Sequence, residues 1–208
     1  MQTILTEHES ILLNRLAYQG LRRAAEALSA FSGETLTVSD ARAMVQPFQE
    51  IPYLHGNPEE VLVGVHFCIT GDIDGYLLAI FREIDAQLLV ETLLGTRPDT
   101  LDDLDEMALS ALGEAGNILV SSFISEFEPL CGLNSMPSPP AVAVEMSCAI
   151  IASAILPVLE DDGNILLVEA AIHAVEGQAA EAATCSVLFL PTAASWARLR
   201  RAFREQER

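Results

Sequence analysis

The chain has 208 residues, 50% of them hydrophobic, a size that suits one large domain or two small halves sharing a core. A net charge of −19 and a sequence pI near 4.3 exclude the basic surface that nucleic-acid binding needs. The chain has no lysine, and five of its eleven arginines lie near the C-terminus, at Arg198, Arg200, Arg201, Arg204 and Arg208.

The first half of the chain is predicted to fold as a long helix, three strands and a shorter helix. These elements are a helix at Glu9–Phe31, a strand around Thr35–Met44, the strands VLVGVHFCIT and GYLLAIF joined by the turn GDIDG, and a helix within residues 81–94. Thr6 and Glu9 have the spacing of a capping box, and Gly33 and Gly95 stand where helix C-caps are expected. Only Val45–Pro58, with three prolines, shows no clear period.

The second half repeats this order. Its elements are a helix at Leu104–Phe127, a strand around Val142–Ile155, the strands NILLVEAAIHAV and ATCSVLFL joined by EGQAAE, and a helix within residues 189–202. Thr100 and Asp103 place a hydroxyl cap and an acid before the long helix. The link Thr96–Thr100 is too short for a flexible tether between domains.

We therefore predict an α+β fold in a single domain, residues 1–208, with half-repeats at about 1–96 and 97–208. The two pseudo-symmetric helix–strand–strand–strand–helix halves are expected to share one continuous antiparallel sheet, with the two long helices packed on it.

Metal sites and membrane anchors are not predicted. The four cysteines and four histidines are scattered, without a CxxC pair, so we expect the thiols to be small buried hydrophobic groups in a reducing compartment. The start, MQTILTEHES, lacks the features of a signal peptide. The longest apolar run, Ala141 to Leu159, contains Glu145 and Pro157 and is predicted to be a covered strand rather than a membrane span. These features predict a cytoplasmic protein that does not insert into membranes.

The second long helix carries a line of polar side chains. At about 100° per residue, Ser110, Glu114, Asn117 and Ser121 fall within roughly 60° of one another on the helical wheel. The opposite side is apolar and consists of Leu109, Leu112, Gly116, Leu119, Val120, Phe123 and Phe127. We expect the polar line to face solvent. Its small neighbours, which would let a partner protein approach, are Gly113, Ser121 and Ser125.

A glutamate and an asparagine three residues apart are common on solvated helix faces, so the spacing alone favours surface decoration. Asparagine is a poor helix former, and Gly113 and Gly116 each cost about 0.5–1 kcal/mol relative to alanine. Three poor helix formers so close together indicate that another constraint acts on this helix.

The segment ALSALGEAGNIL, with Ser110-x-x-x-Glu114-x-x-Asn117, resembles the D/S-x3-E-x2-N motif of the CheC, CheX and FliY phosphatases of chemotaxis. The repeated layout extends this resemblance over nearly the whole chain. It implies hydrolysis of the aspartyl phosphate of the response regulator CheY. It also implies that Glu114 anchors the regulator by pairing with a lysine of its active site, and that Asn117 inserts beside the acyl phosphate. We expect Ser110 to support packing or to position Glu114.

This chemistry suits the side chains, because phosphoryl transfer from an acyl phosphate needs an in-line water and charge neutralisation rather than covalent help. The amide of Asn117 can both donate and accept hydrogen bonds, so it can orient the water. We expect no cofactor in this chain and Mg²⁺ in the acidic pocket of the partner receiver domain.

Some proteins of this family carry the motif on both long helices. Here the first helix has Ile11, Arg15 and Tyr18 at the corresponding positions, so we predict a single active site, on the second helix. Arg15 and Arg22 share the outer face of the first helix. A solvated or salt-bridged face accounts for them, and the functional hypothesis is a contact site for an acidic partner.

Three other functions fit the sequence less well. In the flagellar switch protein FliM the same fold is a non-enzymatic scaffold, which is the first alternative. A binding-only adaptor for a phosphorylated receiver is the second. Resembling proteins also bind the receptor deamidase CheD, which makes a CheD-like protein a second candidate partner. A small-molecule enzyme would need a pocket with convergent ionisable groups, which the sequence does not display.

Overall fold

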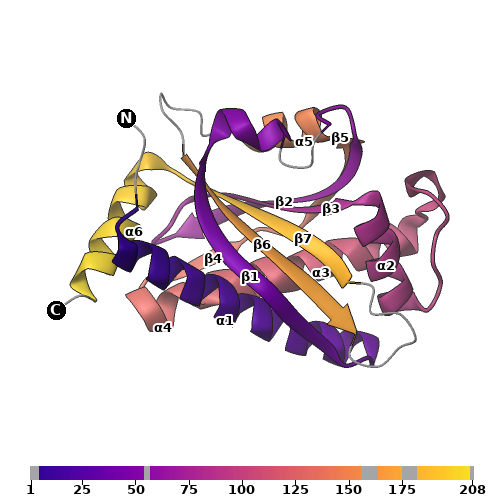
Figure 1. The fold of residues 1–208 in the computed structure, drawn as a ribbon, viewed down its shortest axis with the longest axis horizontal. Helices are drawn as coiled ribbons and strands as arrows, with labels where there is room; N and C mark the ends of the chain where they lie inside the picture. The colour runs from indigo at the N-terminus through magenta and orange to yellow at the C-terminus, as the bar shows by residue number, and fades with distance from the viewer. Residues whose placement is uncertain (1–4, 54–56, 156–163, 175–181, 207–208) are drawn as a thin grey trace.

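The computed structural model describes residues 5–53, 57–155, 164–174 and 182–206, which form a curled antiparallel sheet with helices on both faces (Figure 1). The helices are α1 (Glu7–Ser32), α2 (Glu83–Leu94), α3 (Glu106–Ser125), α4 (Phe127–Cys131), α5 (Ser147–Ile155) and α6 (Ala193–Glu205), with 3-10 turns η1 (Phe48–Tyr53) and η2 (Leu101–Asp103). The strands are β1 (Leu36–Pro47), β2 (Val61–Gly71), β3 (Gly75–Arg82), β4 (Ser135–Pro137), β5 (Ala141–Met146), β6 (Asn164–Ala174) and β7 (Ala182–Pro191).

The two halves exchange one strand each. Within the described residues the sheet has the order β1-β6-β7-β3-β2-β4, and β5 pairs with β2 beside β4. β1 of the first half therefore pairs with β6 of the second half, and β5 of the second half pairs with β2 of the first. The strand order is pseudo-symmetric about the central β3–β7 pair. The predicted fold class is confirmed, and the exchange explains why the halves form one sheet.

The long helices α1 and α3 lie side by side on one face of the sheet (Figure 1). Alternate residues of the strands point toward them, since side chains along a strand alternate between the two faces. A Cβ on Gly20 of α1 would lie 2.7 Å from Cα of Phe123 in α3, so the bare glycine allows the two backbones to approach. Across the same helix pair, Arg23 Nε lies 2.8 Å from Glu126 Oε1.

The predicted capping box at the start of α1 is confirmed. The Thr6 hydroxyl accepts from the Glu9 backbone N–H, and the Glu9 carboxylate accepts from the Thr6 N–H. Glu9 is buried, and Arg200 of α6 donates to its two oxygens from Nε (2.8 Å) and Nη2 (3.1 Å). The predicted C-caps Gly33 and Gly95 are confirmed, with φ values of 80° and 76° in the left-handed region.

The second long helix begins later than predicted. Thr100 and Asp103 do form a capping box, but it caps the start of the 3-10 turn η2, and α3 starts only at Glu106. The side chain of Asp105 caps α3 by accepting from the Ala108 N–H at 2.8 Å. At its other end α3 stops at Ser125, and the separate short helix α4 follows from Phe127.

The predicted strand at Val142–Ile155 is wrong beyond Met146. The pairing of β5 ends where Met146 lies opposite Val61, the first residue of β2, so no strand remains to pair with the next residues. These fold instead as α5, which lies on the face of the sheet opposite α1 and α3 (Figure 1). Its buried residues have helical spacing and pack on a second apolar cluster of the sheet; they are Ile150, Ile151 and Ala154. Residues 156–159 of the same apolar run lie outside the described part.

The hairpins and the remaining predictions have mixed outcomes. β2 and β3 form the first hairpin as predicted, and β6 pairs with β7 as predicted, although the turn EGQAAE lies outside the described residues. The region without a clear period contains the end of β1 and the turn η1. Of the four thiols predicted to be buried, Cys185 is buried, Cys131 and Cys148 are half-buried, and Cys68 is exposed on β2. Burial raises the pKa of the Cys185 thiol to about 12.

One helical segment, Glu106–Cys131, is long and apolar enough to cross a membrane by length and composition alone. In this fold its apolar side packs on the sheet as part of the main core, and its other side carries serines and a carboxylate. These contacts are those of a core helix.

Candidate functional site

The position of α3 is set by its contact with β2. A Cβ on Gly116 would lie 2.9 Å from Val65 Cβ, so this glycine lets the helix backbone lie close to the strand. Leu112, Leu119 and Phe123 are fully buried on the same side. A helix held in this way keeps the side chains of its opposite face in fixed positions.

The polar line lies on the solvent side of α3, as the helical wheel predicts. Ser110 and Glu114 are exposed, and Asn117 and Ser121 are half-buried. Ser121 Oγ donates to Asn117 Oδ1 over 3.4 Å, a long contact that orients the amide oxygen toward the helix. Within the described residues, the Glu114 carboxylate has neither an ion pair nor a hydrogen bond. An acid and an amide are thus available to a partner.

The two sides of this polar line differ. Gly113 was expected to be an open neighbour, and this is wrong: it is buried, with the position of its Cβ 3.1 Å from Val142 Cγ2 and 3.9 Å from Pro140 Cγ. Asn117 lies one turn after Gly113, so it is on the side of α3 that packs against this proline-rich segment, and Glu114 lies about 60° further round the helix. The segment therefore borders the Asn117 side of the polar line. The proline run PSPP, residues 137–140, is the sequence signal that could have indicated it.

The corresponding face of α1 has different chemistry. Ile11, Arg15 and Tyr18 are all exposed, so this helix offers neither an acid nor an amide at the positions of the polar line. Arg22 is also exposed and lies 3.2 Å from Glu26 one turn later.

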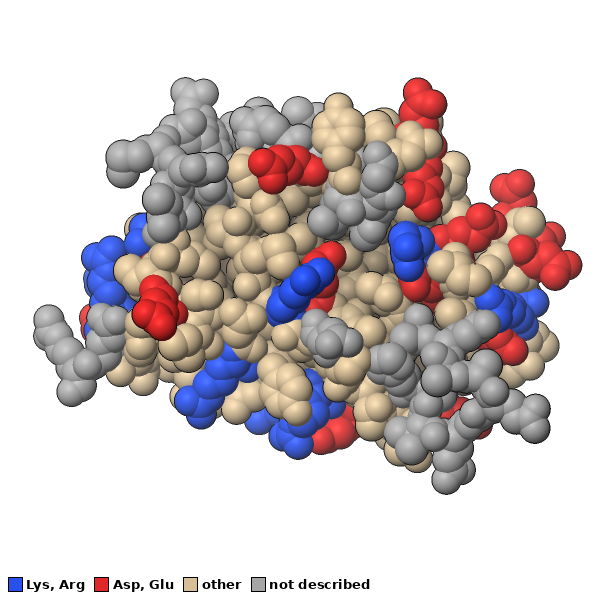
Figure 2. All heavy atoms as spheres, viewed as in Figure 1, with Lys and Arg blue, Asp and Glu red and all other residues tan. Residues whose placement is uncertain are grey.

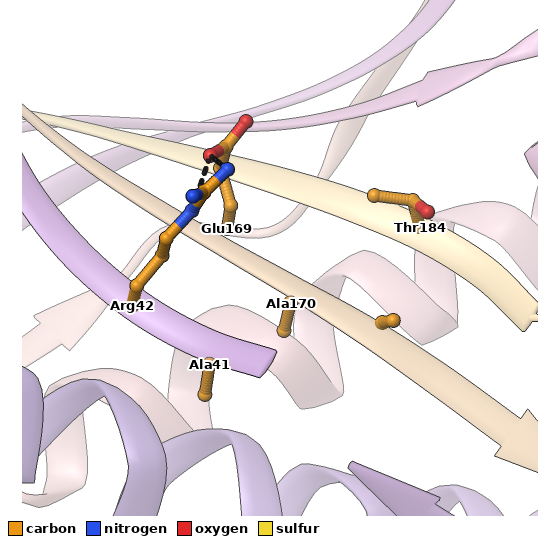
Figure 3. A pocket seen from close by; sticks show the side chains of 6 residues that line it. Ala41, Arg42, Glu169, Ala170 and Thr184 are labelled. Carbon is orange, nitrogen blue, oxygen red and sulfur yellow. Dashed lines mark hydrogen bonds and ion pairs between the residues drawn. The ribbon is translucent and has the colours of Figure 1, made fainter. Parts of the chain in front are cut away.

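A hollow on the sheet provides an alternative place for a ligand (Figure 3). It has a volume of about 540 Å³ and opens where the pairing of β1 with β6 shifts between Ser39 and Arg42. The hollow has two ionic side chains, and Arg42 donates from Nε to Glu169 Oε2 at 3.0 Å. Their charges therefore neutralise each other. The other side chains that line it are Ala41, Ala170, Ala171 and Thr184. This lining does not favour a small-molecule enzyme.

In the described part of the chain, histidine, cysteine and acidic side chains do not gather in groups of three or more that could hold a metal ion.

Part of the chain matches the model of a known family. Residues 107–144, which cover the polar line, the proline-rich segment and most of β5, match the family model of the CheC-like family. The CheY-P phosphatase CheC of Bacillus subtilis (strain 168) is 24% identical over 170 residues, 81% of each chain. The predicted resemblance is confirmed.

Solved structures show how far the fold is shared. FliY of Thermotoga maritima superposes with a TM-score of 0.78 and 18% identity over 98% of this chain and 99% of that chain. The middle domain of FliM from Vibrio alginolyticus gives a TM-score of 0.63 and 14% identity over 93% and 99%. At these identities the likeness establishes the fold, and function must be argued from the residues on α3.

Proposed function

We propose that this protein is a cytoplasmic phosphatase that hydrolyses the aspartyl phosphate of a CheY-like response regulator. The observation that carries the proposal is the placement of Glu114 and Asn117 on one accessible face of a helix backed by the sheet. The relative named CheY-P phosphatase supports the same reaction.

Glu114 anchors the regulator. Its carboxylate is exposed and has no ion-pair partner within the described residues, so it can pair with a lysine at the rim of the phosphorylated pocket. Ser110, one turn earlier on the same face, is small and leaves this approach open. Binding through Glu114 brings α3 over the phosphoryl group.

Asn117 then positions the attacking water. Because its Oδ1 already accepts from Ser121, the amide is oriented before the partner arrives, and less rotamer entropy is lost on binding. The amide has no charge to titrate, so it can hold a water in line without a tuned pKa. Mg²⁺ in the regulator's own acidic pocket would neutralise the phosphoryl charge.

The test is a phosphate-release assay with phosphorylated CheY-like regulator, Mg²⁺ and a substoichiometric amount of this protein. Asn117→Ala should lower kcat by about 100-fold, because the water loses its position. Glu114→Ala should mainly raise KM or weaken binding, because the anchor is lost. Matched controls are Asn134→Ala and Glu128→Gln, which change exposed residues of the same types away from the polar line.

Catalytic turnover that Asn117→Ala removes supports the phosphatase. Turnover that is unchanged in Asn117→Ala contradicts the assigned role of this residue. Stoichiometric protection of the phosphorylated regulator, without turnover, would instead select the adaptor or the FliM-like scaffold.

A further inference from the structure

The outer face of α1 exposes large apolar side chains. Ile11 is 59% exposed and Tyr18 is 52% exposed, and Arg15 and Arg22 lie on the same face at helical spacing. These four residues, here called the α1 stripe, follow one another at intervals of four, three and four positions. They extend over about 16 Å of the helix axis.

The α1 stripe lies on the positively charged side of an acidic protein. The ion pair between Arg200 and Glu9 joins α1 to α6. Seven of the eleven arginines belong to these two helices: Arg15, Arg22, Arg23, Arg198, Arg200, Arg201 and Arg204. Figure 2 shows blue atoms along the left and lower borders of this face, where α6 and α1 lie, and red atoms concentrated on the right. The same two helices carry four glutamates, Glu7, Glu9, Glu26 and Glu205, so their net charge is +3, in a chain whose net charge is −19.

The charges of the α1 stripe are available to a partner. Within the described residues, Arg15 makes no ion pair, and Arg22 makes one with Glu26 in which both side chains are more than half exposed. Such exposed pairs contribute little to stability, so a partner carboxylate can replace Glu26.

We infer that the α1 stripe binds an acidic amphipathic segment of a partner protein. Carboxylates of the segment pair with Arg15 and Arg22, and its apolar side chains cover Ile11 and Tyr18. A helix with apolar residues at intervals of three and four and acidic residues between them has the matching pattern. This inference does not depend on the proposed phosphatase activity, because it concerns a different helix.

Two other occupants fit the α1 stripe less well. In a twofold dimer through this face, Arg15 would lie opposite Tyr18 and Arg22 opposite Ile11 of the other copy, so neither arginine would meet an acid, and two chains of −19 repel each other. An anionic membrane would be repelled by the same net charge, and two apolar side chains bury too little area to overcome it.

The test is site-specific photo-crosslinking in the host cell with the full chain. p-Benzoylphenylalanine replaces Tyr18, and a matched sample has it in place of Tyr53, an exposed tyrosine of η1. The expected result is an adduct from position 18 with another protein through a peptide rich in Asp and Glu. The double variant Arg15→Glu, Arg22→Glu should lower its yield at least tenfold. The charge-matched control Arg42→Glu, Arg97→Glu should leave the yield unchanged.

The inference is overturned by any of four results: no adduct at position 18, an equal adduct at position 53, an adduct only with a second copy or with lipid, or a yield that survives the reversal of Arg15 and Arg22. Circular dichroism and thermal melting of each variant establish that it is folded. The partner peptide, once identified, gives a second measurement by fluorescence anisotropy, in which replacing its Glu by Gln should raise Kd at least tenfold.

Discussion

The two long helices have the same place in the two halves of the fold but different outer faces. Each position of α1 corresponds to one 99 residues later in α3, so Arg15 corresponds to Glu114. On the sheet side the helices are alike: Leu13 and Leu112 are both buried. On the solvent side, Arg15 and Tyr18 stand where α3 has Glu114 and Asn117.

The flanks of the two helices also differ. At the position that corresponds to Gly113, α1 has Asn14, whose Oδ1 accepts from the Ala43 N–H of β1 at 2.9 Å. On α3 the glycine instead allows direct packing against Val142 of β5. The scaffold therefore constrains the buried side of each helix, whereas the outer side makes few contacts within the chain and can acquire a different binding function on each helix.

The strongest test of this comparison replaces two outer residues of α3 by the residues at the corresponding positions of α1. The double variant Glu114→Arg, Asn117→Tyr should lower the phosphate-release rate by about 100-fold or more, since both the anchor and the water-positioning amide are lost. Its melting temperature should stay close to that of the unmodified protein, because both sites face solvent. The control Glu128→Arg, Asn134→Tyr introduces the same side chains elsewhere on the surface and should retain the activity. Full activity in the Glu114→Arg, Asn117→Tyr variant would contradict the claim that the outer face of α3, unlike that of α1, carries the catalytic residues.

The next test concerns the buried sides of the helices. Gly20→Ala should destabilise the protein by about 2 kcal/mol, because the new Cβ would lie 2.7 Å from the backbone of Phe123 and the two helices would have to separate. Gly113→Ala should change stability by less than about 0.5 kcal/mol, since alanine favours the helix and only the half-buried side chain of Val142 must shift. Urea unfolding measures both values. Equal effects would show that the two glycines have the same packing role.

Much of this architecture could be predicted from the sequence because helical and strand periods are local signals. The capping box at Thr6 and the outward orientation of Glu114 depend only on residues within one or two turns. The helix α5 was missed because a short apolar run rich in β-branched residues has the same composition in a strand and in a buried helix. Its conformation is decided by the start of β2 at Val61, beyond which β5 has no strand to pair with, and no local pattern reveals this.

The candidate site was only partly predictable for the same reason. The polar line follows from helical spacing. The packing of Val142 of β5 against Gly113, on the Asn117 side of this line, is a tertiary contact that helical spacing does not reveal. The exchange of β1 and β5 between the halves was likewise not visible in the repeat, because a repeat shows which elements exist and not which half each strand joins.

The smallest expected effect concerns the carboxylate of Glu9 at the start of α1, which has no counterpart at the start of α3. Burial raises the pKa of Glu9, but the hydrogen bonds from Arg200 and the Thr6 backbone, with the charges of Arg200 and Arg204, outweigh it and hold the pKa below its usual value. A lowered pKa in the folded state means that this carboxylate stabilises the protein above its unfolded pKa, about 4.3, and that the contribution is lost as the pH falls through the folded value. Ala108 occupies the corresponding position on α3, so α3 has no carboxylate there.

Glu9→Gln should therefore lower the free energy of unfolding by about 1–2 kcal/mol at pH 7, because the amide keeps the shape but loses the charge that Arg200 binds. The difference from the unmodified protein should begin to shrink as the pH falls below the unfolded pKa, about 4.3, and should disappear below the lowered folded pKa, where Glu9 is protonated in both the folded and the unfolded chain. Urea unfolding at pH 7 and at progressively lower pH measures this difference, with Glu7→Gln, an exposed acid in the same turn, as the matched control. A difference that stays constant with pH would show that the Glu9 side chain acts through packing and not through its charge.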